Sequence, residues 1–262
     1  MINQDNFQII REWYEKYVAG FYTGDQEFDE NIRMKEEHTE RVCAVITDIG
    51  SSISLPDEPL VIAETIALLH DVGRYEQFAK YGTFVDLHSE DHALLSVKII
   101  KRYAVLDAIE PPVKELILCG VTNHNKKEIP DSIDEDCLLY TRLIRDADKI
   151  DILKVITDYY ANSARKRNKY MELGLPDTPE ISDRVIADLS AGRFVHTTDL
   201  KTLNDFKLLQ MGWVYDLHFR RTYRIFRERG YVRKLYEVLP HTPEIVTVYI
   251  KIEEFLTRQC AD

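Results

Sequence analysis

The sequence predicts an all-α fold. Only 10 glycines and 9 prolines occur in 262 residues, so long helices can form without interruption. Hydrophobic residues make up 45% of the chain, enough to fill a sizeable core. Most of them recur at intervals of three and four, which is typical of a helix with one buried face, rather than at every second position as in a strand. These observations together predict a helical bundle.

In chain order, turn signals bound the first five expected helices. The expected ranges are 3–20, 31–54, 58–73, 88–102 and 111–124. The turn SLPDEP ends the second helix, GTFVDLHS separates the third from the fourth, and YAVLDAIEPP separates the fourth from the fifth. Such segments end helices because proline and glycine cannot continue them cheaply and Asp and Asn favour turns.

Four more helices are expected in the second half of the chain, at 136–160, 179–190, 200–228 and 242–260. The turn NHNKKEIPDSIDED precedes the first of them. Residues 165–180 are polar and end in a Pro-rich turn, so we expect a mobile excursion there, and a short strand pair is considered around FVHTTD. No composition shift marks a linker, which predicts a single domain over residues 1–262.

Charge and composition exclude several classes of function. The formal net charge of -11 and the sequence pI near 5.3 argue against nucleic-acid binding, which needs a basic surface. No apolar stretch is long enough to cross a membrane, and the first residues lack the pattern of a signal peptide. The four cysteines form no CxxC pair and are expected to be reduced thiols. A cytoplasmic protein is the expectation, and a homo-oligomer stays open.

Histidines and carboxylates that should point inward recur on five of the expected helices. His38 lies four residues after Met34 on an apolar line, and Asp148 lies on the line of Ile144 and Ala147. The other members of this set are His70, Asp71, His88, His92 and His124.

Buried groups of this kind need partners, because an unpaired buried carboxylate costs several kcal/mol. A single core histidine is usually just hydrogen-bonded, and a polar network without metal is the alternative interpretation of the whole set. Imidazole nitrogens combined with carboxylate oxygens are, however, the ligands of a divalent transition metal such as manganese, iron, nickel, cobalt or zinc. No nucleophile elbow and no P-loop occurs in the sequence.

The order of these residues resembles the H…HD…D signature of the HD-domain superfamily, which are helical metal-dependent phosphohydrolases. His38, the doublet His70-Asp71 in LLHDVGR and Asp148 in DADKID carry this resemblance over about residues 30–156. It implies an HD-like helical core, with residues 157–262 as a C-terminal helical extension. It also implies that the four matching residues bind one divalent metal, with magnesium as a further candidate.

Two-metal branches of the superfamily add one histidine on each of two further helices. His92 in DHALLSVKII and His124 in VTNH match these positions, with Asp71 as the expected bridge between the ions. The chain departs from the common form in two places: it has Ser96-Val97 instead of a Gly-Ala pair, and Asn125 after His124 instead of a second histidine. One or two ions are therefore expected.

A metal held in this way activates water at neutral pH, and the phosphoryl group then needs positive charge around its oxygens. Lys149 and Arg74 are the candidates for that charge. The alternative is that Lys149 is a solvated surface charge and that Arg74 caps the carbonyl groups at the end of its helix. His88 is assigned a role in the pocket, as a ligand or as a proton donor to the leaving oxygen, with a simple loop residue as the alternative. Asp146 and Asp151 flank Asp148 and are expected to accept hydrogen bonds from ligand imidazoles.

The sequence thus predicts a phosphohydrolase that cleaves a phosphoester of a nucleotide or another small phosphorylated metabolite. Three alternatives remain: a di-iron oxygenase of the same superfamily, a non-catalytic metal-containing module that senses a nucleotide, and a structural helical protein. In the last third, aromatic residues alternate with arginines in MGWVYDLHFRRTYRIFRERG. Most of this stripe is expected to be core, and the segment is hypothesised to close over the metal site.

Overall fold

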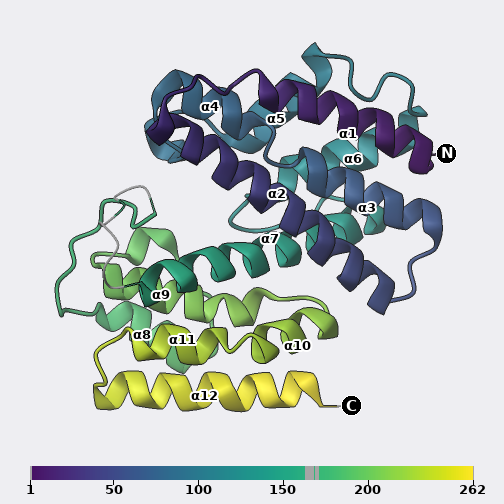
Figure 1. Cartoon of the computed structure of the whole chain (residues 1–262). Helices are drawn as coiled ribbons and strands as arrows, with labels where there is room; N and C mark the ends of the chain where they lie inside the picture. Colours follow the sequence, from purple (N-terminus) through teal and green to yellow (C-terminus); the bar gives the residue numbers. More distant parts are fainter. Residues whose placement is uncertain (1, 163–167, 169–170, 262) are drawn as a thin grey trace. The chain divides into compact units, whose positions relative to one another are not determined.

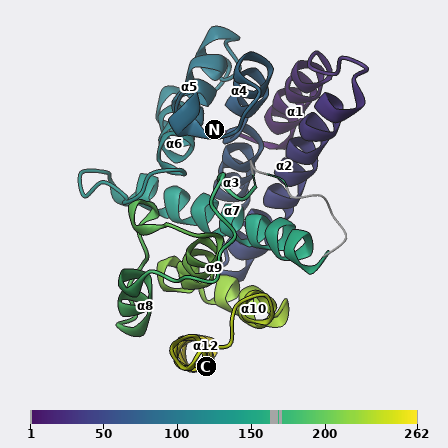
Figure 2. The same cartoon turned by 90° about the vertical axis from the view of Figure 1, so that its left-hand side faces the viewer.

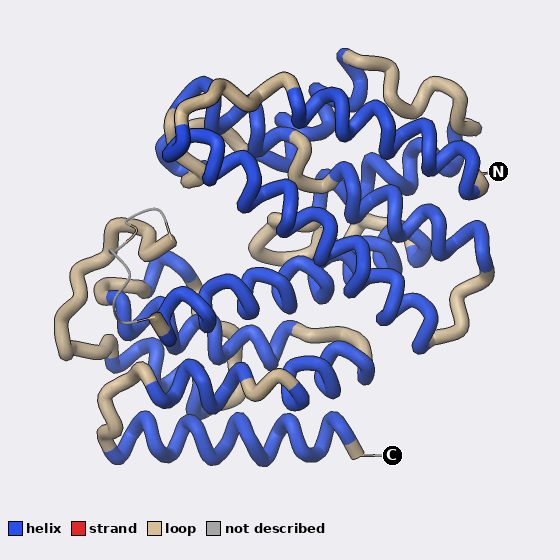
Figure 3. The backbone as a smooth tube through the Cα atoms, viewed as in Figure 1, coloured by secondary structure: helices blue, strands red, loops and turns tan. Residues whose placement is uncertain are grey.

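The computed structural model describes residues 2–162, 168 and 171–261, and every regular element among them is a helix (Figure 3). This confirms the all-α prediction. The strand pair considered around FVHTTD is wrong, since Thr197–Asp199 is a 3-10 helix and its neighbours form loops. Within the expected excursion at 165–180, residues 165–167, 169 and 170 lie outside the described part, and residues 171–180 contain only turns and loops.

The chain divides into two compact units, residues 1–151 and 152–262 (Figure 1). The longest helices include α7, Glu135–Ala161, which runs across this boundary. The boundary expected at residue 157, between the HD-like core and the C-terminal extension, lies close to this division of the chain. The organisation as one folding domain stays a prediction.

The first unit contains the following helices before α7: α1 (Gln4–Ala19), α2 (Gln26–Ser52), α3 (Asp57–Leu69), α4 (Gly73–Tyr81), the 3-10 helix η1 (Asp86–His88), α5 (His92–Arg102) and α6 (Pro111–Asn123). Helix α3 packs against α1, α2 and α6, and α5 packs against α4 and α6 (Figures 1 and 2). From Val61 to Leu69, every side chain of α3 except Glu64 is buried.

Local signals explain where these helices begin. The side chain of Asp25 accepts a hydrogen bond from the amide of Phe28 and starts α2, and Asp91 accepts from two amides at the start of α5. Pro111 occupies the first turn of α6, where no amide hydrogen is needed.

Helix α4 was not predicted. The expected helix 58–73 ends in the structure at Leu69, and a new helix begins at Gly73 after a short turn. Helix α4 is capped at its C-terminal end by Gly82, whose φ of 63° is in the left-handed region that glycine adopts without strain. Gly73, the expected end of one helix, is the first residue of the next.

The second unit contains, after the end of α7, the helices α8 (Asp183–Ser190), η2 (Thr197–Asp199), α9 (Leu203–Gly212), η3 (Trp213–Asp216), α10 (Arg220–Glu228), α11 (Tyr231–Glu237) and α12 (Pro243–Cys260). Helices α8, α10 and α11 each pack against α12, and α9 packs against α8 and α11. The expected helix 200–228 is therefore broken into α9, η3 and α10, and α11 was missed.

Part of the aromatic stripe belongs to the core of the second unit, as expected. Tyr223 is buried, donates its hydroxyl hydrogen to the carbonyl oxygen of Leu217 at 2.6 Å, and contacts the ring of Phe255 on α12. Tyr215 contacts the same ring. The hypothesis that this segment closes over the metal site stays a prediction.

Two further findings concern the cysteines and the membrane. Cys119 on α6 and Cys137 on α7 form a disulfide, so the expectation of reduced thiols is wrong for this pair, while Cys43 and Cys260 are free. In the part of the chain that the structure describes, no helix has the length and hydropathy that a membrane span requires.

Candidate metal centre

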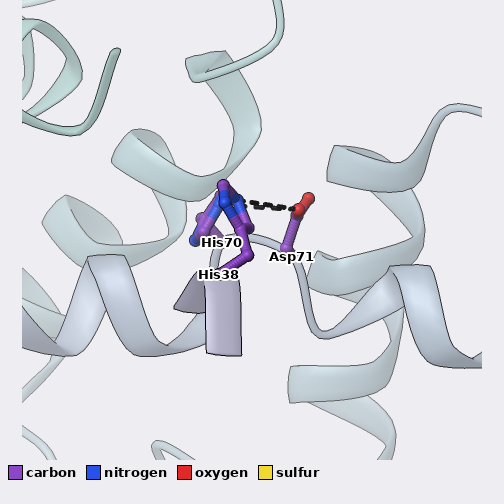
Figure 4. A group of neighbouring side chains, drawn as sticks. All are labelled: His38, His70 and Asp71. Atoms are coloured by element: carbon purple, nitrogen blue, oxygen red, sulfur yellow. Dashed lines mark ion pairs between the residues drawn. The ribbon is translucent and has the colours of Figure 1, made fainter. Parts of the chain in front are cut away.

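Six polar residues from five helices of the first unit converge on one buried point. His38 comes from the middle of α2 and Asp148 from the middle of α7, whereas the others lie at helix ends. His70 and Asp71 follow α3, His92 opens α5, and His124 follows α6. Figure 4 shows the side chains of His38, His70 and Asp71 directed toward one another.

One half of this centre surrounds Oδ2 of Asp71. This oxygen lies 3.6 Å from Nε2 of His38 and 3.6 Å from Nε2 of His70. On the opposite side, Oδ1 of Asp148 lies 3.2 Å from Nε2 of His38 and 3.9 Å from Nε2 of His70. Two imidazoles and two carboxylates therefore enclose the same small volume.

The other half surrounds Oδ1 of Asp71. This oxygen lies 3.4 Å from Nε2 of His92 and 3.7 Å from Nε2 of His124, and the two imidazole nitrogens are 3.0 Å apart. Asp71 thus presents one oxygen to each half, the arrangement expected of a bridging carboxylate.

Several of the converging atoms are buried without a hydrogen-bond partner among the described residues. They are Nε2 of His38, Nε2 of His70 and Oδ1 of Asp71. A buried polar atom without a partner costs about 1–3 kcal/mol. Three such atoms in one cluster therefore indicate a binding site for a ligand that can pair with them. Imidazole nitrogens and carboxylate oxygens are the ligands of a divalent transition metal. The ligand atoms of His38, His70 and Asp71 lie within 4.8 Å of one another, and so do those of Asp71, His92 and His124.

The second ring nitrogen of every imidazole is held by an acceptor. Nδ1 of His70 lies 2.7 Å from the carbonyl oxygen of Ala67, and Nδ1 of His124 lies 2.8 Å from that of Val121. For His38 and His92 the acceptors are the carboxylates of Asp151 and Asp86. Because these oxygens only accept, Nδ1 carries the hydrogen in each neutral ring, and Nε2 presents its lone pair to the centre.

The electrostatics agree with this assignment. Burial lowers the pKa of His70 to about 3 and that of His92 to about 4, so both rings are neutral near pH 7. Burial would raise the pKa of Asp71, but the charges of Lys35, His70 and Arg74 outweigh it and hold the pKa well below its ordinary value. These two imidazoles are therefore neutral beside the ionised carboxylate of Asp71.

Ser96 explains one departure from the common two-metal pattern. Its hydroxyl group donates to the carbonyl oxygen of His70 at 2.8 Å and accepts from the amide of Gly73 at 2.8 Å. A side chain on Gly73 would come within 2.6 Å of the carbonyl oxygen of His92, so glycine is needed for this close approach of α5. Ser96 therefore fixes the turn that carries His70 and Asp71 against the helix that carries His92.

The other predicted residues occupy different environments. Arg74 lies beside the centre, with Nε 3.4 Å from Oδ1 of Asp71, and Lys149 is buried rather than a surface charge. His88 is exposed, and its side chain makes no hydrogen bond or ion pair with any residue that the structure describes, so its pocket role stays a prediction. Asp146 is buried, and Asp151 accepts from His38, as expected of an acceptor for a ligand imidazole.

Two residues near the centre were missed. Lys35 forms an ion pair with Oδ2 of Asp71, and its position three residues before His38 on the same helical face could have indicated it. Asp86 lies 2.6 Å from Nδ1 of His92. It opens the short 3-10 helix η1 ahead of α5, where no periodic pattern shows the direction of a side chain.

Comparison with known families identifies the first unit. The HD domain family model matches residues 36–153. This range includes all six residues that converge on the centre. Residues 36–153 therefore contain an HD domain. Neither the search of curated proteins nor that of solved structures found a match. HD domains bind divalent metals, and the His and Asp cluster of this HD domain provides candidate ligands for them.

Proposed function

We propose that the protein is a metal-dependent phosphohydrolase that cleaves a phosphoester of a nucleotide or another small phosphorylated metabolite. The observation that carries this proposal is the orientation of four imidazoles. Each has its Nδ1 on an acceptor oxygen, so four Nε2 lone pairs face the two oxygens of one shared carboxylate. Such a set of imidazole nitrogens around a carboxylate is the chemistry of a transition-metal site.

We infer two ions as the full complement, with Asp71 between them. His38, His70 and Asp148 would hold the first ion, and His92 and His124 would hold the second. A divalent metal, when bound, supplies an activated water as the nucleophile and positive charge for the phosphoryl oxygens. Manganese, iron, nickel, cobalt, zinc and magnesium are all compatible with these ligands.

The cations around the centre suit an anionic substrate. Lys35 pairs with Oδ2 of Asp71, its side chain is 15% exposed, and it can turn toward a phosphoryl oxygen once that carboxylate has a metal to neutralise it. Arg74 is less available, because its Nη1 already donates to Gln77, to Asp86 and to the carbonyl oxygen of Phe84. Lys35 is therefore the stronger candidate for phosphate contact, and Lys149 remains a further one.

A phosphatase screen tests the proposal. Purified protein is freed of metal, reloaded separately with each of the six metals, and assayed for phosphate release from nucleoside phosphates and sugar phosphates. We expect turnover with at least one metal and none after chelation or in Asp71→Asn. Bound metal and a bound nucleotide without phosphate release would favour the sensing module, and oxygen consumption by an iron-loaded form would favour the oxygenase. Absence of stoichiometric metal under all conditions would contradict the proposal.

A further inference from the structure

The four imidazoles of the centre are oriented in two different ways. His70 and His124 each use a carbonyl oxygen three residues earlier in their own helices. His38 and His92 instead use carboxylates from other elements. Nδ1 of His38 lies 2.7 Å from Oδ2 of Asp151, and Nδ1 of His92 lies 2.6 Å from Oδ2 of Asp86. Each half of the centre therefore has one imidazole fixed by its own helix and one fixed by a separate aspartate.

An arginine holds each of these aspartates. Nε of Arg41 donates to Oδ1 of Asp151 at 2.6 Å, and its Nη2 donates to Oδ2 at 3.1 Å. Nη1 of Arg74 donates to Oδ1 of Asp86 at 2.9 Å. The same sequence of contacts, from arginine to aspartate to histidine, thus occurs once on each side of Asp71.

Asp86 is fixed by more than Arg74, although its side chain is 33% exposed. Its Oδ1 accepts from Nε2 of Gln77 at 2.9 Å, and Gln77 is fully buried and also donates to the hydroxyl group of Ser89. Asn125 lies 3.5 Å from Oδ2 and donates to Asp91, the residue that caps α5, at 2.9 Å. These donors leave Oδ2 of Asp86 oriented toward His92.

We propose that Asp86 is a positioning residue for the second half of the metal centre, as Asp151 is for the first half, and that the two act independently. Asp86 keeps the hydrogen of His92 on Nδ1, which leaves the lone pair of Nε2 for a metal. Arg74 belongs to this arrangement as the residue that holds Asp86. The inference rests on the proposed function to the extent that the centre binds metal.

Substitution by asparagine separates this role from general stability. The amide offers one acceptor oxygen and one donor NH2 group. In Asp86→Asn, the oxygen is required by Arg74 and Gln77, which both donate, so the NH2 group faces His92. The ring must then accept on Nδ1 and carry its hydrogen on Nε2, where it blocks a metal. Asp151→Asn should do the same to His38, because Arg41 makes its shorter contact, 2.6 Å, with Oδ1 and so favours the amide oxygen at that position.

The experiment compares wild-type protein with Asp86→Asn and Asp151→Asn. Each is loaded with manganese or cobalt, and ions per chain and affinities are measured by mass spectrometry and calorimetry. We expect two ions in the wild type. Asp86→Asn should keep the first ion and bind the second about ten- to a hundredfold more weakly, whereas Asp151→Asn should weaken the first ion by a similar factor.

A second measurement does not depend on metal. Nitrogen NMR of the histidine rings in metal-free protein should show the hydrogen of His92 on Nδ1 in the wild type and on Nε2 in Asp86→Asn, with the other rings unchanged. Two ions of wild-type affinity in Asp86→Asn, or an unchanged His92 ring, would overturn the inference. A wild-type protein that binds no metal but shows the expected ring change would instead overturn the proposed function alone.

Discussion

The two halves of the metal centre share Asp71 but differ in charge. In the first half, Oδ1 of Asp148 lies 3.2 Å from Nε2 of His38, whereas in the second half the carboxylate next to Nε2 of His92 and of His124 is that of Asp71, and Asp148 is more distant. In addition, Nε of Arg74 lies 3.4 Å from the Asp71 oxygen that faces the second half. Because cation binding strengthens with negative charge, the first half should bind metal tightly and the second half weakly.

The comparison also shows how the second half depends on the first. Two neutral imidazoles alone attract a divalent ion only modestly, so the second ion needs the charge of Asp71. His38 and His92 occupy equivalent positions, yet their proton affinities differ. The carboxylates of Asp148 and Asp151 raise the pKa of His38 against the effects of burial and of Lys35, whereas burial lowers the pKa of His92 to about 4.

The largest effect should come from Asp71, the residue common to both halves. Asp71→Asn removes the shared negative charge and should empty both halves, with phosphate release falling to background. Helix content measured by circular dichroism serves as the control for folding. A purified variant with wild-type metal content and turnover would mean that Asp71 is not the bridge.

The next largest effect should separate the halves. His124→Ala removes a ligand of the second half only, so we expect one retained ion per chain, whereas Asp148→Asn should lower the occupancy of the first. Metal analysis after extensive dialysis measures both. If His124→Ala lost both ions, or neither, the division into a strong and a weak half would be incorrect.

A smaller effect is expected at Lys35. Removal of its charge in Lys35→Met should lower kcat by about ten- to a hundredfold, since a charge-assisted hydrogen bond contributes about 1.5–3 kcal/mol. Neither metal should be lost, because an ammonium group offers no lone pair. Lys98→Met, at a lysine whose side chain is 63% exposed, is the matched control. Unchanged kinetics in Lys35→Met would leave only a structural role for this lysine.

The smallest effect concerns stability in the metal-free protein. Because the pKa of His92 falls from 6.5 to about 4 on folding, unfolding takes up a proton between these pH values. The free energy of unfolding should therefore fall as the pH drops through this window, by at most about 3 kcal/mol from His92. His38 acts in the opposite direction, since its raised pKa stabilises the folded protein below pH 6.5 and that contribution is lost as the pH rises.

Urea denaturation of wild type, His92→Gln and His38→Gln at a series of pH values measures these two contributions. We expect His92→Gln to weaken the loss of stability on acidification and His38→Gln to strengthen it. The same pH dependence in all three proteins would contradict the assigned pKa directions.

Local periodicity sufficed to predict the helical class and the inward direction of His38 and Asp148, because both properties depend on residues three and four positions apart. It did not suffice for α4, since Gly73 is required there by the approach of α5 and not by its own helix. The partnership of Asp86 with His92 and the disulfide between Cys119 and Cys137 depend on turns and on contacts between helices. Such contacts leave no signal in the spacing of residues along the chain.

Crystals of manganese-loaded protein test the central claim most directly, through anomalous scattering from the metal. We expect a strong peak between Oδ2 of Asp71 and the side chains of His38, His70 and Asp148, and a weaker peak between Oδ1 of Asp71, His92 and His124. No peak in contact with Asp71, at saturating manganese and with ordered side chains, would contradict it.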